Sequence, residues 1–307
     1  MSGSPAARTM PTVRTLVIGR VLMLVYRTGR RIGPLLSDRS RRSIVRVGSW
    51  LAWRRGGPAV DQLRENLSGL TGGQPTEALV RAGIGSWLRN FLETFALAGW
   101  SGTQVLQRVS VRGEDALRAA VAERGAVVAL PHSANWDLAG AWACLTGMPV
   151  TTVAEELTGP IATEYAEFVR LRSALGMTVI SHRDPVALQK LVRAARPGQV
   201  VCLVADRDLL GAGLAVRWGS RVDAPRVTLP AGPALVARRS GAALFAMVAR
   251  YTDTGIAMTI GAEIEARPGR DGLVAMTQRI ADFFADRLAR QPEDWHMMVP
   301  FFAVDAR

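Results

Sequence analysis

The sequence predicts an α/β protein with a mostly parallel central sheet flanked by helices, preceded by an all-helical, membrane-associating N-terminal section. Three observations lead to this prediction. From Val105 onward, short β-branched apolar runs alternate with helical segments, which is typical of a parallel α/β sheet. The first hundred residues carry helical patterns only, and their first sixty hold almost all of the net positive charge. We therefore expect two parts, residues 1–104 and residues 105–307.

The net positive charge of the chain is concentrated in its first sixty residues. The formal net charge is +12, and residues 1–60 hold twelve arginines against the single acid Asp38. A basic segment of this kind favours anionic lipid or nucleic acid. These arginines accompany apolar helix faces and not exposed stacking aromatics, so we expect a membrane surface and no nucleic acid as the partner.

The N-terminal helical patterns suit a membrane interface better than a membrane span. In Val13–Ile32 the apolar run is interrupted by Arg20 and ended by Arg27, whereas a spanning helix needs about 20 mostly apolar residues. Arg41–Arg55 again combines apolar positions with arginines, and it contains tryptophan, which sits well at headgroup depth. The alternative is that these helices pack on the protein core and expose a basic face to solvent. Two further helices are expected, at Val60–Leu70 and Thr76–Ala98.

The α/β part is predicted element by element. Candidate strands are Val109–Arg112, Ala126–Leu130, Val150–Ala154, Thr178–Ser181, Val200–Ala205, Ala215–Trp218, Leu244–Arg250 and Ala257–Ile260. Candidate helices are Glu114–Arg124, Leu138–Leu145, Ile161–Leu175, Pro185–Ala195, Ala231–Ser240 and Leu273–Arg290. The two cysteines, Cys144 and Cys202, lie inside apolar runs and read as buried thiols of a reducing compartment.

The stretch VVALPHSANWD, from Val127 to Asp137, is the first candidate site. A buried strand stops at Pro131, and Ser133 and Asn135 are good N-cap residues for the helix that follows. His132 thus stands at the carboxyl end of a strand, where ligands gather in open α/β sheets.

The spacing of His132 and Asp137 predicts a general base with its orienting carboxylate. An aspartate that binds one imidazole nitrogen leaves the other free to take a proton from a substrate. No G-x-S-x-G nucleophile motif is present, so a substrate hydroxyl would have to act as the nucleophile. A structural histidine with an unrelated aspartate remains the alternative.

Two further constellations are candidates for the same site. Asp206, Arg207 and Asp208 follow the strand Val200–Ala205, although such a cluster in isolation is more often a surface turn with an internal ion pair. Arg170 and Arg172 lie on the helix Ile161–Leu175 and suit a phosphate or carboxylate, unless they belong to a solvated helix face.

Several motifs together resemble a known family. HSANWD, ADRDL (Ala205 to Leu209) and PEDWHM (Pro292 to Met297) are similar, in this order, to motifs of the glycerophosphate and lipid A acyltransferase superfamily. The nearest branch is that of the actinobacterial phosphatidylinositol mannoside acyltransferases, and the resemblance covers about residues 10 to 302. Asp206 stands where a glutamate is common in this branch.

The resemblance implies an acyl-CoA-dependent acyltransferase at the cytoplasmic face of the plasma membrane, peripherally bound. It would esterify a mannose hydroxyl of phosphatidylinositol mannoside, with another glycolipid or phospholipid acceptor, a non-catalytic lipid-binding module or a thioesterase-like hydrolase as alternatives. His132 would be the general base, Asp137 its orienter, and Asp206 a further catalytic group that positions the acceptor. Substrate-binding roles would fall to Asn135, Arg207 and one or both of Arg170 and Arg172, with Arg170 slightly favoured. No metal or bound cofactor would be required.

Overall fold

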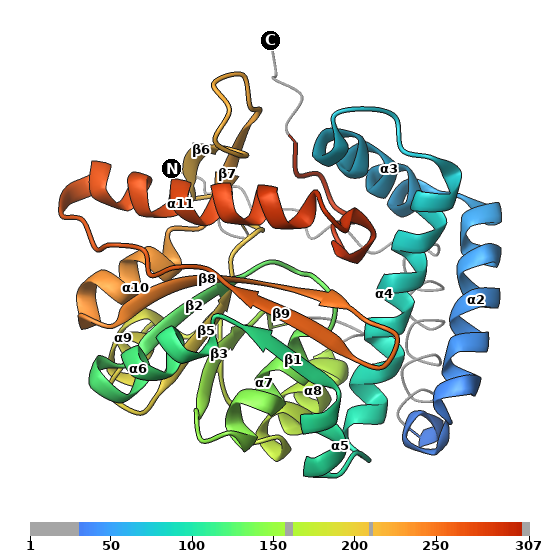
Figure 1. Cartoon of the computed structure of the whole chain (residues 1–307), viewed down its shortest axis with the longest axis horizontal. Coiled ribbons are helices and arrows are strands. Elements are labelled where there is room, and N and C mark those ends of the chain that lie inside the picture. Colours follow the sequence, from blue (N-terminus) through green and yellow to red (C-terminus); the bar gives the residue numbers. More distant parts are fainter. Residues whose placement is uncertain (1–30, 157–161, 209–210, 303–307) are drawn as a thin grey trace, which may run out of the picture.

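The structure is a computed structural model that describes residues 31–156, 162–208 and 211–302. It confirms an α/β fold with a mostly parallel central sheet, flanking helices and a helical N-terminal section (Figure 1). Nearly all of the predicted helix Val13–Ile32 lies outside the described residues. The division at residues 104 and 105 stays a prediction.

The order of the elements follows the predicted alternation closely. The α-helices are α2 (Asp38–Arg55), α3 (Pro58–Thr71), α4 (Glu77–Leu97), α5 (Gly102–Gln107), α6 (Glu114–Arg124), α7 (Trp136–Leu145), α8 (Ala162–Ala174), α9 (Ala187–Ala194), α10 (Gly232–Ser240) and α11 (Gly269–Leu288). The strands are β1 (Val109–Arg112), β2 (Ala126–Leu130), β3 (Val150–Ala154), β4 (Thr178–Ser181), β5 (Val200–Val204), β6 (Leu214–Arg217), β7 (Arg226–Leu229), β8 (Ala243–Tyr251) and β9 (Ile256–Ile260). Short 3₁₀ turns occupy Gly33–Leu35 and Pro292–Asp294.

Over the described residues, the central sheet has seven strands in the order β1-β9-β8-β2-β5-β3-β4, and only the β8–β9 pair is antiparallel. One predicted strand, Ala215–Trp218, does not join it. That segment forms β6, which pairs antiparallel with β7 in a separate two-stranded sheet, and β7 was not predicted. Because β7 is a short strand with exposed Arg226 and Thr228, its alternation gives little signal in the sequence.

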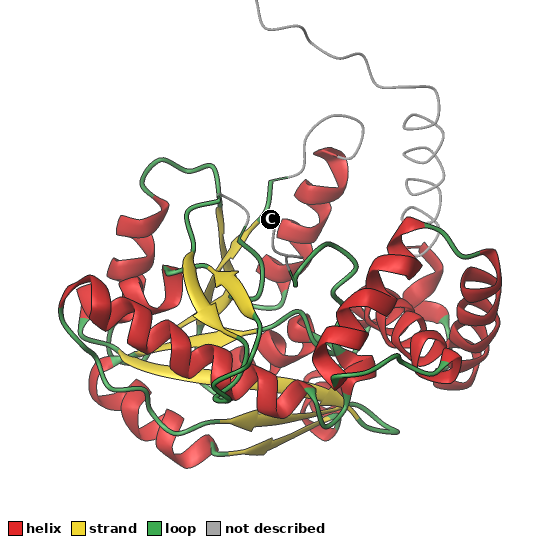
Figure 2. Ribbon diagram, turned by 90° about the horizontal axis from the view of Figure 1, so that it is seen from above, coloured by secondary structure: helices red, strands yellow, loops and turns green. Residues whose placement is uncertain are grey.

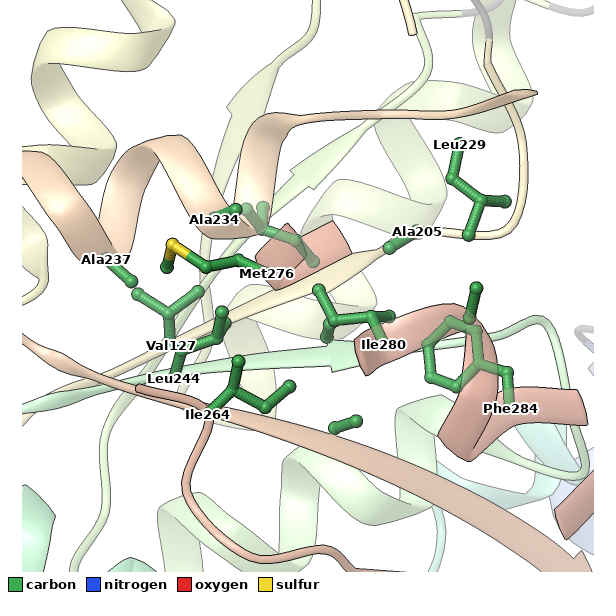
Figure 3. Packing of buried hydrophobic residues seen from close by; sticks show 14 of the residues in the cluster. Val127, Ala205, Leu229, Ala234, Ala237, Leu244, Ile264, Met276, Ile280 and Phe284 are labelled. Atoms are coloured by element: carbon green, nitrogen blue, oxygen red, sulfur yellow. The ribbon is translucent and has the colours of Figure 1, made fainter. Parts of the chain in front are cut away.

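Alternate residues of the central strands point to opposite faces of the sheet and so supply two cores. On β2, Val127 and Ala129 pack toward α9, α10 and α11, whereas Val128 and Leu130 pack toward α6 and α7. Figure 3 shows the first core, in which Val127 and Leu244 of the sheet meet Met276 and Ile280 of α11. Helices therefore cover both faces, and the strand ends at the sheet edge are left to form a site.

The N-terminal helices stand together at one side of the sheet (Figure 2). Ser37 caps α2 and Thr76 caps α4 through side-chain oxygens that accept backbone N–H groups three residues on. Asn66 of α3 ties this section to the C-terminal segment, because its side-chain amide donates to the carbonyls of Met297 and Val299 at 2.8 Å each. Within the described ranges, no helix has the length and apolar character that crossing a bilayer demands.

Candidate active site

His132 and Asp206 are brought together by the register of two neighbouring parallel strands. Leu130 of β2 pairs with Val204 of β5, and the amide of Ala205 extends the ladder by donating to the Leu130 carbonyl at 2.8 Å. Beyond this pair the backbone continues for two residues on each strand, to His132 after β2 and to Asp206 after β5. The two side chains therefore meet at the carboxyl edge of the sheet although 74 residues separate them.

The contact between the two side chains is short, and its carboxylate is almost fully buried. His132 Nδ1 lies 2.6 Å from Asp206 Oδ1, and the backbone N–H of His132 donates to Oδ2 at 2.8 Å. Asp206 is only 1% exposed. Burial alone would raise the pKa of this carboxyl, but the His132 charge and the hydrogen bonds from His132 and Trp295 together hold its pKa below the usual value.

The ionised carboxylate fixes the tautomer of the histidine. Because Asp206 can only accept, Nδ1 of His132 carries the proton and donates it to Oδ1. The other ring nitrogen, Nε2, then presents its lone pair, and it has no hydrogen-bond partner among the residues that the structure describes. The ring itself stands edge-on to Trp136, with centroids 5.4 Å apart. His132 therefore has the geometry of a general base.

The predicted contact between His132 and Asp137 is wrong. The carboxylate of Asp137, 2% exposed, accepts from the guanidinium of Arg172, with 2.6 Å between Oδ1 and Nε and 3.4 Å between Oδ2 and Nη2. Asp137 lies in the first turn of α7, and its carboxylate is taken by an arginine from α8. Spacing along the chain did not reveal this, because the carboxylate nearest the imidazole comes from another strand.

A third group on Asp206 comes from the C-terminal segment. The indole N–H of Trp295, a side chain that is 1% exposed, donates to Asp206 Oδ2 at 2.9 Å. Around it, Ala134 N–H donates to the carbonyl of Asp294, and His296 N–H donates to the carbonyl of His132. Residues 294–296 thus run antiparallel to the His132 loop and hold it against β5.

Trp295 was not predicted as a site residue, and no site role was predicted for His296. The signal that could have found Trp295 was its place inside PEDWHM, one of the three motifs of the family resemblance. His296 is buried, and its Nε2 lies 2.9 Å from Ser86 Oγ. Burial, assisted by the charge of nearby His132 and opposed by that of Asp206, lowers the pKa of His296 to about 3, so this ring is neutral at pH 7.

The loop between β2 and α7 is tightly constrained. Ala134 has a φ of 48°, in the left-handed region that non-glycine residues rarely adopt, and such strain concentrates at functional sites. Asn135 was predicted to bind substrate, but it is fully buried and its Oδ1 accepts from Leu138 N–H as the N-cap of α7. Its role in the structure is to start the helix, and it does not reach the pocket.

A pocket of about 380 Å³ opens at this edge of the sheet. His132 and Asp137 both line it, together with Trp87, Asn90, Phe91 and Thr94 of α4, and Trp136, Val153, Ala154, Glu155, Phe168, Arg172, Leu203, Val204 and Arg207. The side chain of His132 is 24% exposed here, so its imidazole is open to a ligand.

The three predicted arginines differ in their placement. Arg172 lines the pocket, whereas Arg170 is 69% exposed, pairs with Glu167 at 2.5 Å, and is not part of the pocket lining. The preference for Arg170 over Arg172 is therefore overturned. Arg207 lines the pocket 3.7 Å from Glu155, so the predicted alternative of an ion pair inside the 206–208 turn does not form.

An apolar cavity of about 80 Å³ adjoins the pocket, between α7 and the sheet. Trp136, Asp137, Val153, Arg172 and Val204 line both spaces. The deeper part is formed by aliphatic, methionine and tryptophan side chains such as Val128, Trp142, Met148 and Met177. Across residues 31–156, 162–208 and 211–302, no cluster of three or more His, Cys, Asp or Glu side chains is arranged to hold a metal ion.

Comparison with known proteins defines the class to which this fold and site belong. The pattern of the bacterial lipid A biosynthesis acyltransferase family matches residues 13–303, so the chain belongs to that family and is an acyltransferase. It is 35% identical over 295 residues to the phosphatidylinositol mannoside acyltransferase of Mycolicibacterium smegmatis, covering 94% of this chain and 93% of that protein. The proteins of the same name from two strains of Mycobacterium tuberculosis are each 33% identical over 288 residues, covering 91% of this chain and 88% of theirs. The family resemblance read from the motifs is thereby confirmed.

Proposed function

We propose that this protein transfers an acyl group from acyl-CoA to a mannose hydroxyl of phosphatidylinositol mannoside, with His132 as the general base. The observation that carries the proposal is the imidazole of His132, locked by Asp206 at Nδ1 and open to the pocket at Nε2. The names of the relatives support the acceptor.

The reaction we propose needs no acyl-enzyme. Nε2 of His132 takes the proton of the acceptor hydroxyl while the oxygen attacks the thioester carbonyl. The tetrahedral intermediate then collapses, the C–S bond breaks, and the imidazolium gives its proton to the departing coenzyme A thiolate. Asp206, ionised throughout, stabilises the imidazolium formed in between. No metal or bound cofactor enters these steps.

Electrostatic stabilisation of the intermediate is assigned to the start of α7. Among its loop amides, Ser133 N–H donates to Pro131 O, and Ala134 N–H donates to Asp294 O. Leu138 N–H is taken by Asn135. The amides of Trp136 and Asp137, in the first turn of the helix, are the donors we propose for the oxyanion.

The walls of the pocket divide between the two substrates. The apolar cavity behind Trp136 would take the first part of the acyl chain, because a hydrocarbon is stabilised by about 0.8 kcal/mol for each buried CH₂. Arg207 and the Arg172–Asp137 pair stand at the polar side and would contact the sugar or the phosphates of the substrates.

We further propose that the protein works on the cytoplasmic face of the plasma membrane, attached from one side. Helix α2 exposes four large apolar side chains, Ile44, Val47, Trp50 and Leu51, over two successive turns. An apolar helix face with arginines beside it suits the headgroup region of an anionic leaflet.

The test is the purified variant His132→Ala with acyl-CoA and phosphatidylinositol mannoside. We expect transfer to fall by on the order of 10²–10⁴-fold with an unchanged melting temperature, since His132 is part-exposed and its loop is held by backbone bonds. Wild-type turnover in this variant would contradict the role of His132 as the general base. Mass spectrometry of products from a panel of acceptors tests the mannoside separately, and thiol release without acceptor would indicate a hydrolase.

A further inference from the structure

A second concave site lies on the other flank of α4, away from the active-site pocket. It is a cleft of about 630 Å³ between α2, α4 and the turn that joins β8 to β9. Figure 1 shows these three elements meeting at the same end of the molecule. The cleft shares no lining residue with the active-site pocket, since α4 turns Asn90 and Thr94 to one and Arg89 and Glu93 to the other.

Positive charge dominates this cleft. Among the residues that the structure describes, five arginines line it, namely Arg41, Arg42, Arg46, Arg89 and Arg108, against the three carboxylates of Asp38, Glu93 and Asp253. The excess of two guanidiniums in a concave, partly enclosed site concentrates a positive potential there.

Three of the arginines are fixed by the protein and form the wall of the cleft. Arg41 and Arg108 both pair with Asp38, and the guanidinium of Arg108 lies 4.5 Å from the Trp100 ring. Arg89 pairs with Glu93 at 2.7 Å and stacks 3.9 Å from the Tyr251 ring. These groups are held in place before any ligand arrives, which lowers the entropy lost on binding.

The other two arginines provide the excess charge. Arg42 and Arg46 stand one helical turn apart on α2 and are exposed. Neither guanidinium makes a hydrogen bond or ion pair with any residue in the described part of the chain. Two guanidiniums at this spacing beside a concave wall match the bidentate recognition of a phosphate group.

We propose that this cleft binds a phosphate group, and that the phosphate is the headgroup of an anionic phospholipid. The exposed Trp50 lies one turn beyond Arg46 on the same side of α2, and tryptophan rings sit at headgroup depth, so a lipid whose phosphate occupies the cleft would have its headgroup beside this ring. The cleft would then fix how the enzyme sits on the bilayer, separately from the acceptor lipid in the active site. A soluble phosphate, such as a nucleotide, shares the chemistry and is the alternative source.

The experiment compares two charge-matched double variants of the full chain. R42Q/R46Q removes the two exposed cleft arginines, and R54Q/R55Q removes two exposed arginines from the end of the same helix, outside the cleft. Binding to vesicles of phosphatidylcholine with phosphatidylinositol is measured by co-sedimentation, with vesicles of phosphatidylcholine alone as the reference. Diffuse electrostatic attraction to the vesicle would lower the vesicle affinity of both variants alike, by about five-fold for each arginine removed.

A phosphate held in the cleft predicts a loss in R42Q/R46Q that is roughly tenfold or more larger than the loss in R54Q/R55Q. Equal losses in the two variants, or no loss in either, would overturn the lipid headgroup as the occupant of the cleft. Calorimetric titration with glycerophosphoinositol and with adenosine 3′,5′-bisphosphate identifies the source. Binding of the bisphosphate that R42Q/R46Q abolishes, with equal vesicle binding of both variants, would assign the cleft to a soluble phosphate and overturn the lipid.

The inference stands apart from the proposed reaction. In detergent with a dispersed acceptor, R42Q/R46Q should keep wild-type turnover, whereas His132→Ala should keep wild-type vesicle binding. Turnover therefore tests the proposed reaction and vesicle binding tests the phosphate cleft, so either proposal can fail without the other.

Discussion

Asp206 and Asp137 are two buried carboxylates on the same pocket, and their partners give them different chemistry. Asp206 faces an imidazole, whose charge can change during a reaction, and accepts two further N–H groups. Asp137 faces the guanidinium of Arg172, whose charge is permanent. A carboxylate next to a titratable partner can stabilise a charge that appears in a transition state, whereas one next to a permanent cation mainly fixes a structure.

The largest expected effect tests the first carboxylate. Asp206→Asn should lower kcat for acyl transfer by on the order of 10²–10⁴-fold, because an amide no longer holds the imidazole in the tautomer with a proton on Nδ1. Asp206→Glu is the matched control and should retain part of the activity. Steady-state kinetics of both variants decide the point, and equal activity of Asn and Glu variants would contradict it.

Asp137→Asn tests the second carboxylate and should act mainly on stability. Removing the carboxylate of a buried ion pair costs about 3–5 kcal/mol, and less is expected here because Arg172 is 16% exposed. Denaturant unfolding measures the free energy of unfolding. The double variant Asp137→Asn/Arg172→Gln should lose less of this free energy than the two single variants added together. A fall in kcat as large as that of Asp206→Asn would erase the contrast between the two carboxylates.

Asp294 extends the comparison to a buried carboxylate with no ion pair among the described residues. It accepts from Ser86 Oγ, Tyr251 N–H and Gln291 Nε2, and burial raises its pKa to about 6 from 3.8. Because the pKa of Asp294 is higher in the folded state, its protonated form stabilises the fold. This contribution is complete below a pH of about 3.8 and is lost as the pH rises through about 6.

The pH dependence of unfolding checks this assignment. Between these two pH values the wild type should lose up to about 3 kcal/mol relative to Asp294→Asn, which has no group to ionise there. Parallel stability curves for the two proteins across this window would show that Asp294 does not titrate in it.

The smallest expected effect concerns the indole on Asp206. Trp295→Phe keeps most of the buried ring but removes the N–H that donates to Oδ2, so stability should fall by about 1–3 kcal/mol and kcat by less than in Asp206→Asn. The pH profile of kcat separates a positioning role from a packing role. A merely structural Trp295 would leave this profile unchanged, whereas loss of a donor to Asp206 should shift it.

Much of the fold was predictable because buried strands and capped helices leave local signals. The bounds of β1 to β4 and of α6 coincide with the prediction, and the strands β2 and β5 carry unbroken apolar runs. The site was predictable only in part. His132 and Asp206 were both identified, but which carboxylate meets the imidazole depends on the order of strands in the sheet. β5 lies beside β2 although two strands intervene in the chain, and no local pattern records that. Trp295 was missed for the same reason, since it reaches the site from a remote segment.

The bonds from residues 294–296 to the His132 loop also bear on how the protein is made. Because a chain leaves the ribosome from its N-terminus, the central strands can pair long before Trp295 emerges. The loop around Ala134, strained at a φ of 48°, has its outer support only when that last segment arrives. A nascent chain that has yet to release it would thus be folded across most of the sheet, with His132 already on Asp206, while the loop still lacks the hydrogen bonds that hold it from outside.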